Sequence, residues 1–215
     1  MSSTHAAAKE HLRQILTDYC RNGNAECPDI ERLKNLFSKV SDDQRYELLS
    51  SITDSYGYTV LTLAAYRGHT ELCVTLLSSL PPADRLKLIL VDGITALHTA
   101  AYRGYTNTIS GILNCLTADQ QLQLLFTQDS IGDTALHDSA QRGRTETVKA
   151  LFDNLTSEQQ LKLLFVLDNA GKTACQLAAA SKQKETVKTL KKYERDADSE
   201  VNYGKWRNYN VLPEN

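Results

Sequence analysis

Apolar residues recur along this chain in sets of four, at positions i, i+3, i+4 and i+7. Residues at this spacing lie on one face of a helix, so each set predicts a short amphipathic helix that buries that face. The sets are Leu33, Leu36, Phe37 and Val40; Cys73, Leu76, Leu77 and Leu80; Ile109, Ile112, Leu113 and Leu116; and Val148, Leu151, Phe152 and Leu155.

A glycine-bounded motif precedes the last three sets and occurs once more near the C-terminus. It reads G-Y-T-V-L-T-L-A-A-Y-R-G from Gly57, G-I-T-A-L-H-T-A-A-Y-R-G from Gly93, G-D-T-A-L-H-D-S-A-Q-R-G from Gly132 and G-K-T-A-C-Q-L-A-A-A-S-K from Gly171. The starting glycines are therefore 36, 39 and 39 positions apart. A fixed period of this length is typical of a solenoid. Each motif predicts a helix that begins at its threonine, and the first three helices end at a glycine.

The motif resembles the ankyrin repeat, whose signature is T-P-L-H-x-A-A followed by x-x-G, with a period of about 33 residues. The resemblance covers roughly residues 41 to 191. The signature proline is replaced by Val60, Ala96, Ala135 and Ala174. The resemblance implies an all-α solenoid in which every unit has an inner helix, an outer helix and a short β-hairpin or loop finger. It also implies a concave surface of fingers and inner helices that contacts partner proteins.

The extra length of these units predicts one more short helix in each repeat. The segments S-D-D-Q from Ser41, T-A-D-Q from Thr117 and T-S-E-Q from Thr156 have the spacing of a capping box. The corresponding segment after Leu80 begins with two prolines, which suit a first helical turn. We expect the leucine pairs near the ends of these helices to face inward: Leu48 and Leu49, Leu124 and Leu125, Leu163 and Leu164.

The pattern divides the chain into three parts. Residues 1–40, with helices expected at 5–20 and 29–40, are interpreted as a helical N-terminal capping repeat, because an end repeat must present a polar face to water. Residues 41–195 hold the four repeats, of which the last acts as the C-terminal cap. Residues 196–215 are polar and aromatic, and we expect a tail that packs back through Trp206 and Tyr209.

Composition narrows the class of protein. The chain has 215 residues, 41% apolar content, 23% charged residues and a formal net charge of −2, so it has no overall attraction to nucleic acid or to an anionic membrane. No apolar run is long enough to span a membrane, and the first residues lack the layout of a signal peptide. The five cysteines form no pairs at metal-binding spacing, which favours a reducing, cytoplasmic location. We expect the chain alone to be monomeric.

The sequence shows no motif for catalysis, a cofactor or a metal, and we expect a non-catalytic protein. His98 and His137 share one repeat position, and the resemblance implies that they bond the inner helix to the finger. The aspartates that precede the fingers are interpreted as turn formers: Asp54, Asp92, Asp129 and Asp168.

Tyrosine and arginine gather at the positions that the resemblance places on the concave surface. These two side chains are enriched among the residues that dominate binding energy. Arginine pairs with carboxylates and tyrosine buries apolar area, so the expected partner is a protein with an acidic and partly apolar surface. The candidate residues are Tyr56, Tyr58, Tyr66, Arg67, Tyr102, Arg103, Tyr105, Gln141, Arg142 and Arg144.

The function that we predict is a non-catalytic scaffold or adaptor that binds a protein. The long unit resembles ankyrin arrays of invertebrate multirepeat proteins and of symbiont, phage or pathogen effectors, which implies a eukaryotic host protein as the target and delivery into host cytoplasm without a cleaved signal. Three alternatives stay open: the chain is the non-catalytic portion of a larger enzyme or signalling protein, the tail is a linear motif, or the arginines bind nucleic acid. The acidic overall balance disfavours the last.

Overall fold

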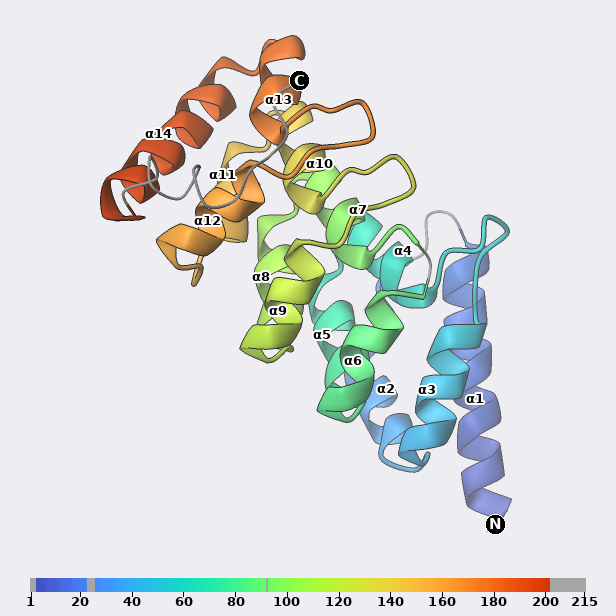
Figure 1. Ribbon diagram of the computed structural model, residues 1–215. Coiled ribbons are helices and arrows are strands. Elements are labelled where there is room, and N and C mark those ends of the chain that lie inside the picture. Colours follow the sequence, from blue (N-terminus) through green and yellow to red (C-terminus); the bar gives the residue numbers. More distant parts are fainter. Residues whose placement is uncertain (1–2, 23–25, 92, 202–215) are drawn as a thin grey trace.

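The computed structural model of the protein describes residues 3–22, 26–91 and 93–201. Over these residues the chain forms fourteen helices, which stack into an elongated array (Figure 1). The helices are α1 Ser3–Arg21, α2 Ile30–Phe37, α3 Asp42–Ser51, α4 Val60–Arg67, α5 Thr70–Ser78, α6 Pro82–Ile89, α7 Ala96–Arg103, α8 Thr106–Asn114, α9 Ala118–Leu125, α10 Ala135–Gln141, α11 Thr145–Phe152, α12 Ser157–Leu164, α13 Ala174–Ala180 and α14 Lys184–Val201.

Three rows of helices build the array. The inner helices α4, α7, α10 and α13 pack one on the next, and so do the outer helices α5, α8, α11 and α14. The third row, α3, α6, α9 and α12, consists of the extra helices predicted from the unit length. The helices α1 and α14 lie at opposite ends of the stack (Figure 1). The all-α solenoid with one additional helix per repeat is confirmed.

The fingers are loops in the part of the chain that the structure describes. Of the two expected forms, hairpin or loop, the described fingers have the loop form, with one isolated bridge between Thr53 and Thr59. Each described finger is a tight turn closed by an aspartate. The Oδ1 atom of Asp54 accepts the amide N–H of Tyr56 and of Tyr58, at 2.8 and 2.9 Å. These side-chain bonds satisfy donors that a ladder would use, so the finger needs no strand pairing.

The other fingers repeat this turn. Asp129 Oδ1 accepts the amides of Ile131 and Asp133, and Asp168 Oδ1 accepts those of Ala170 and Lys172. The interpretation of these aspartates as turn formers is therefore confirmed at three positions. The fourth, Asp92, lies outside the described residues.

Caps at the helix starts follow the sequence closely. The boxes formed by Thr117 with Gln120 and by Thr156 with Gln159 are both present, and Pro82 occupies the first turn of α6. The expected box at Ser41 is wrong in one respect, because the Ser41 side chain makes no capping bond to α3.

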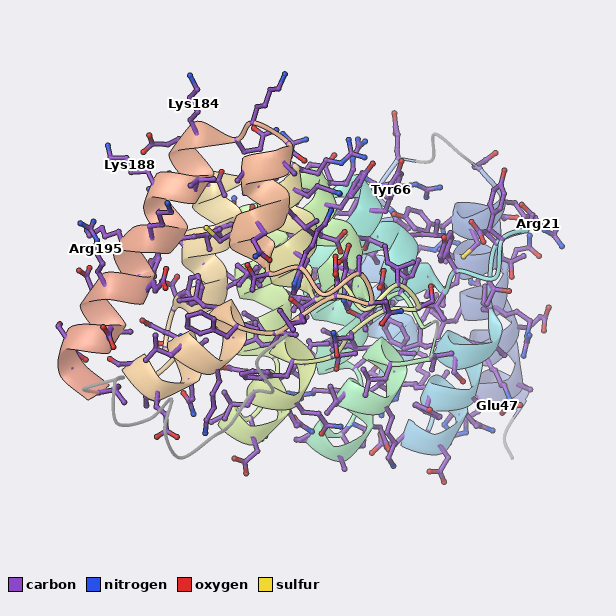
Figure 2. All side chains as sticks on the ribbon, turned by 45° about the horizontal axis from the view of Figure 1, so that its top comes forward. Arg21, Glu47, Tyr66, Lys184, Lys188 and Arg195 are labelled. Carbon is purple, nitrogen blue, oxygen red and sulfur yellow. The ribbon has the colours of Figure 1, made fainter. Side chains whose placement is uncertain are left out.

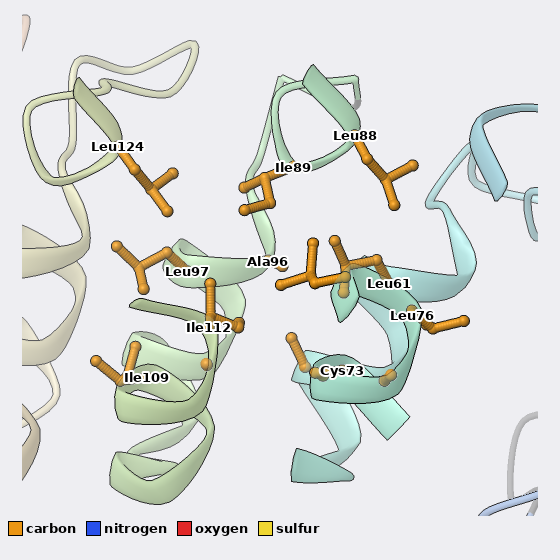
Figure 3. Packing of buried hydrophobic residues seen from close by; sticks show 14 of the residues in the cluster. Leu61, Cys73, Leu76, Leu88, Ile89, Ala96, Leu97, Ile109, Ile112 and Leu124 are labelled. Atoms are coloured by element: carbon orange, nitrogen blue, oxygen red, sulfur yellow. The ribbon is translucent and has the colours of Figure 1, made fainter. Parts of the chain in front are cut away.

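The extra helices close one side of the core. In Figure 3, Leu88 and Ile89 of α6 point toward Leu61 of α4 and Leu97 of α7. All four side chains are at most 1% exposed. The leucine pairs of α3, α9 and α12 are buried as well, as predicted from their spacing. Side chains of α6 thus cover buried side chains of the two inner helices α4 and α7.

Glycines end the first three inner helices in the left-handed region, with φ of 75° at Gly68, 82° at Gly104 and 68° at Gly143. In the last repeat Lys182 takes the same conformation, with φ of 60°. Side chains with a Cβ atom pay a penalty there that glycine does not. The last repeat therefore keeps the backbone turn of its predecessors without the residue best suited to it.

Different helices close the two ends of the array: α1 and α2 at the N-terminal end, and α14 at the C-terminal end. Helix α1 packs against α2 and α4, and α2 packs against α5. At the other end α14 reaches Val201, so residues 196–201 of the expected tail are helical, and Ala197 is buried. Trp206 and Tyr209, which were expected to pack back on the array, lie outside the described residues.

Candidate protein-binding groove

A groove of about 730 Å³ lies between the first finger and the inner helices α4, α7 and α10. We call it the N-terminal groove. Five predicted binding residues line it, namely Tyr56, Tyr58, Tyr66, Arg67 and Tyr102. Tyr56 at the finger tip is 83% exposed and Tyr66 is 46% exposed, so two large aromatic rings face solvent here. Figure 2 shows Tyr66 and Arg21, which also lines the groove, in the N-terminal half of the array.

Three of the predicted arginines, which lie one repeat apart at the ends of successive inner helices, are paired with tyrosines. Each guanidinium lies over the tyrosine ring of the preceding unit. The distances from guanidinium carbon to ring centroid are 4.4 Å for Arg67 over Tyr19, 4.9 Å for Arg103 over Tyr66 and 4.0 Å for Arg142 over Tyr102. This arginine–tyrosine column links four successive units through cation–π contacts.

The column explains why tyrosine and arginine are neighbours in the Y-R-G motif. On the last turn of an inner helix, Tyr102 faces the next repeat while Arg103 faces the previous one. Arg67 is held further, because its guanidinium donates to the carbonyl oxygens of Tyr19 at 3.0 Å and Asn22 at 2.8 Å. Arg103 and Arg142 stay exposed, so their outer donors remain available to a partner.

Tyr105 and Arg144 follow the helix-ending glycines and pack on the preceding repeat. A Cβ atom on Gly68 would meet the Tyr105 ring at 3.0 Å, and one on Gly104 would meet Arg144 Cδ at 2.7 Å. Each side chain therefore covers a glycine. The close contact, like the positive φ, disfavours any residue with a Cβ atom at that glycine position. Tyr105 is consequently half-buried, and neither residue lines the N-terminal groove.

The remaining predicted residues lie in a separate, shallower hollow near the C-terminal end. Gln141, Arg142 and Arg144 line this hollow of about 500 Å³ together with Ser181 and Gln183. The structure thus divides the predicted set between an aromatic groove and an arginine-rich hollow, with Arg103 and Tyr105 between them.

Sequence reasoning missed the acidic residues of the N-terminal groove. Asp54, Asp129 and Asp138 all line it. Burial raises the pKa of Asp138 to about 8, and repulsion from Asp133 and Asp129 adds to this. One signal was available, since Asp138 is the only acidic residue of the four inner helices and holds the position of Leu63 and Thr99 in the earlier repeats.

The two repeat-register histidines have the structural role that the resemblance implied. His98 is 1% exposed, and its Nε2 atom lies 2.9 Å from the carbonyl oxygen of Asp133 in the next finger. Its Nδ1 atom lies 2.8 Å from the Thr95 hydroxyl, which fits a neutral ring that donates from Nε2. His137 repeats the arrangement with Lys172 and Thr134, and burial lowers the pKa of both histidines.

Burial raises the pKa of the thiols of Cys73, Cys115 and Cys175, which works against thiolate formation. Within residues 3–22, 26–91 and 93–201, no three histidine, cysteine or acidic side chains are placed to hold a metal ion. Over the same residues, none of the helices combines the length and apolar character needed to cross a membrane.

Comparison with protein families agrees with this architecture. The family model for ankyrin repeats (3 copies) matches residues 5–123, 80–162 and 112–203. The chain therefore belongs to the ankyrin-repeat family. Ankyrin repeats are generally protein–protein interaction modules, and proteins built from them are typically non-catalytic. The comparison with curated proteins finds no match.

Proposed function

We propose that this protein is a non-catalytic adaptor that binds a partner protein through the N-terminal groove and the arginine–tyrosine column. The exposed aromatic surface at the groove carries the proposal. Tyr56 and Tyr66 present large rings at a concave site that is framed by inner helices. Tyrosine offers large contact area at low entropic cost, and concave aromatic sites concentrate binding energy.

The two halves of the surface differ in charge, and this defines the partner further. Arg103, Arg142 and Arg144 are exposed beyond the groove, where they favour carboxylates on the partner. The groove itself holds three aspartates. The partner that we propose therefore presents an acidic and partly apolar surface to the arginines. From the resemblance alone, we carry forward the hypothesis that the partner is a eukaryotic protein.

Affinity capture from eukaryotic lysate with mass spectrometry tests the proposal. The parent protein is compared with a groove variant, Tyr56→Ser and Tyr66→Ser, after circular dichroism has shown that both are folded. The matched control is Ile131→Ser and Leu167→Ser, which removes two exposed side chains, 61% and 46% exposed, that do not line the groove. We expect the control to keep the captured protein and the groove variant to lose it.

Two outcomes would contradict this function. Capture of the same protein by the parent and the groove variant would show that the groove is not used. If deletion of residues 202–215 abolished capture instead, the tail would carry the binding determinant.

A further inference from the structure

We propose that the N-terminal groove receives a basic segment of the partner protein, with the charged end of an arginine or lysine side chain against Asp129 and Asp138. This inference rests on the proposed function and adds the chemistry that the groove selects. It assigns the groove a ligand charge opposite to the one that the exposed arginines select.

The carboxylates of the groove carry the first part of the argument. Asp129 and Asp138 come from different elements, the finger loop and α10, and both line the groove. The Oδ1 atom of Asp129 is used by two backbone amides of its own turn. The carboxylate of Asp138 forms no hydrogen bond or ion pair with the described residues, although a carboxylate in a partly dehydrated site gains much from a partner.

A third carboxylate lies next to this pair. Asp133 is only 4% exposed, and its Oδ1 atom has no hydrogen-bond partner in the described part of the chain. Its charge raises the pKa of Asp138, as does that of Asp129. Native proteins rarely leave a buried carboxylate oxygen without a donor. Asp133 itself does not line the groove, but a cation beside Asp129 and Asp138, which do, would relieve this repulsion.

The basic side chains that line the groove are not placed to neutralise these acids. They are Arg21 and Arg67, and both come from the N-terminal end of the groove. The Arg67 guanidinium is bound by two carbonyl oxygens and stacks on Tyr19. His98 faces the groove from α7, but burial lowers its pKa, so it remains neutral near pH 7.

Aromatic walls favour an organic cation. Among the described residues, the arginines of this protein lie over the rings of Tyr19, Tyr66, Tyr102 and Tyr105, and none lies over Tyr56 or Tyr58. These two rings belong to the first finger and line the groove. A second basic side chain of the same bound segment can stack on these rings, while the first lies against the carboxylates at the other end of the groove.

The size of the groove and the charge of its lining residues define the class of ligand. The carboxylates are not spaced as ligands of a single metal ion in the described chain. Nucleic acid is anionic and would be repelled by Asp54, Asp129 and Asp138. A groove of about 730 Å³ that opens along several repeats accepts an extended chain segment, in which one basic side chain lies at the acidic end.

Fluorescence polarisation with labelled hexaarginine, hexalysine and hexaglutamate tests the assignment at ~150 mM salt. The test variant is Asp129→Asn and Asp138→Asn. Asparagine at position 129 keeps the Oδ1 acceptor that closes the turn, so the finger is retained. The control is Asp43→Asn and Asp119→Asn, which replaces two aspartates in the same way at exposed sites outside the groove.

We expect both basic peptides to bind the parent and the control equally, and to bind the test variant at least about tenfold more weakly, whereas the test variant should not weaken the binding of hexaglutamate to the exposed arginines. Because the cation favours the ionised carboxylate, binding near pH 7 is expected to release a proton from Asp138. Calorimetry in two buffers of different ionisation enthalpy measures this release, which the test variant should lose.

Failure of this inference is distinguishable from failure of the proposed function. No binding of the basic peptides to the parent, or equal weakening by the test and control variants, would overturn it. If the test variant still captured the partner that Tyr56→Ser and Tyr66→Ser lose, the groove would bind a protein without using the acidic residues. That result would overturn the cation site and leave the adaptor function intact.

Discussion

Asp138 makes the stability of the array depend on pH in an unusual direction. Its pKa is raised from 3.8 to about 8 in the folded chain, mainly by burial on α10. Between these two values the folded protein holds a proton that the unfolded chain has lost. Stability therefore falls as pH rises through this window, whereas most carboxylates of native proteins act in the opposite direction. The change Asp138→Asn removes this titration and keeps the shape of the side chain.

The size of the effect follows from the two pKa values. A pKa change from 3.8 to about 8 corresponds to at most ~6 kcal/mol. The Asp138 side chain is only half-buried, and screening by water reduces this value, so we expect ~2 kcal/mol. The variant and the parent should be equally stable near pH 4, and the variant should be more stable by this amount near pH 9.

Urea unfolding monitored by circular dichroism at several pH values between about 4 and 9 measures the difference. The titrations of His98 and His137 are present in both proteins and cancel to first order. Asp119→Asn, at an exposed site on α9, is the control and should give a difference that does not vary with pH. A parent and Asp138→Asn variant with parallel pH profiles would refute the reasoning.

Three further changes test the packing of the repeats. Lys182→Gly should stabilise the last repeat by ~0.5–1 kcal/mol, because glycine adopts the left-handed φ of 60° without penalty; a loss of Tm would contradict this. His137→Ala should lower the free energy of unfolding by ~2 kcal/mol, since the hydrogen bonds to Thr134 and to the Lys172 carbonyl are lost. His137→Gln should lower it less in urea unfolding, because Gln176, at the same position of the last repeat, keeps the helix cap. In a double-mutant cycle on thermal unfolding, Arg142→Ala and Tyr102→Ala should couple by ~0.5–1 kcal/mol, and purely additive effects would count against the column.

The helices could be predicted from the sequence because the residues that begin and end each helix belong to the same repeat. Thr95 caps the start of an inner helix and Gly104 ends it, and neither role depends on residues far away in the sequence. The extra helix was visible for the same reason, through the local box of Thr117 and Gln120. The conformation of the fingers was harder to predict from the sequence. Asp54 can precede either a hairpin or a loop, and only the backbone of the folded finger decides which amides its side chain accepts.

The candidate site was only partly predictable, because its properties arise between repeats. Their positions within the repeat identified Tyr66 and Arg103 as surface residues. The stacking of Arg103 on the Tyr66 ring depends on the spacing of adjacent repeats, which the sequence does not give. The packing of Tyr105 over Gly68 has the same origin. Asp138 was overlooked because an aspartate on a helix is usually solvated. Its high pKa comes mainly from burial in the folded array, and repulsion from Asp133 and Asp129 of the finger adds to it.

Site-specific photo-crosslinking tests the central claim most directly, because it reports contact at a single position. A benzophenone amino acid is introduced at Tyr56 in the groove and, in a second protein, at Lys188, which projects from α14 at the far end of the array (Figure 2). After irradiation in eukaryotic lysate, we predict that position 56 crosslinks a partner protein and that position 188 does not. Crosslinks from position 188 with none from position 56 would contradict the assignment of the groove as the binding surface.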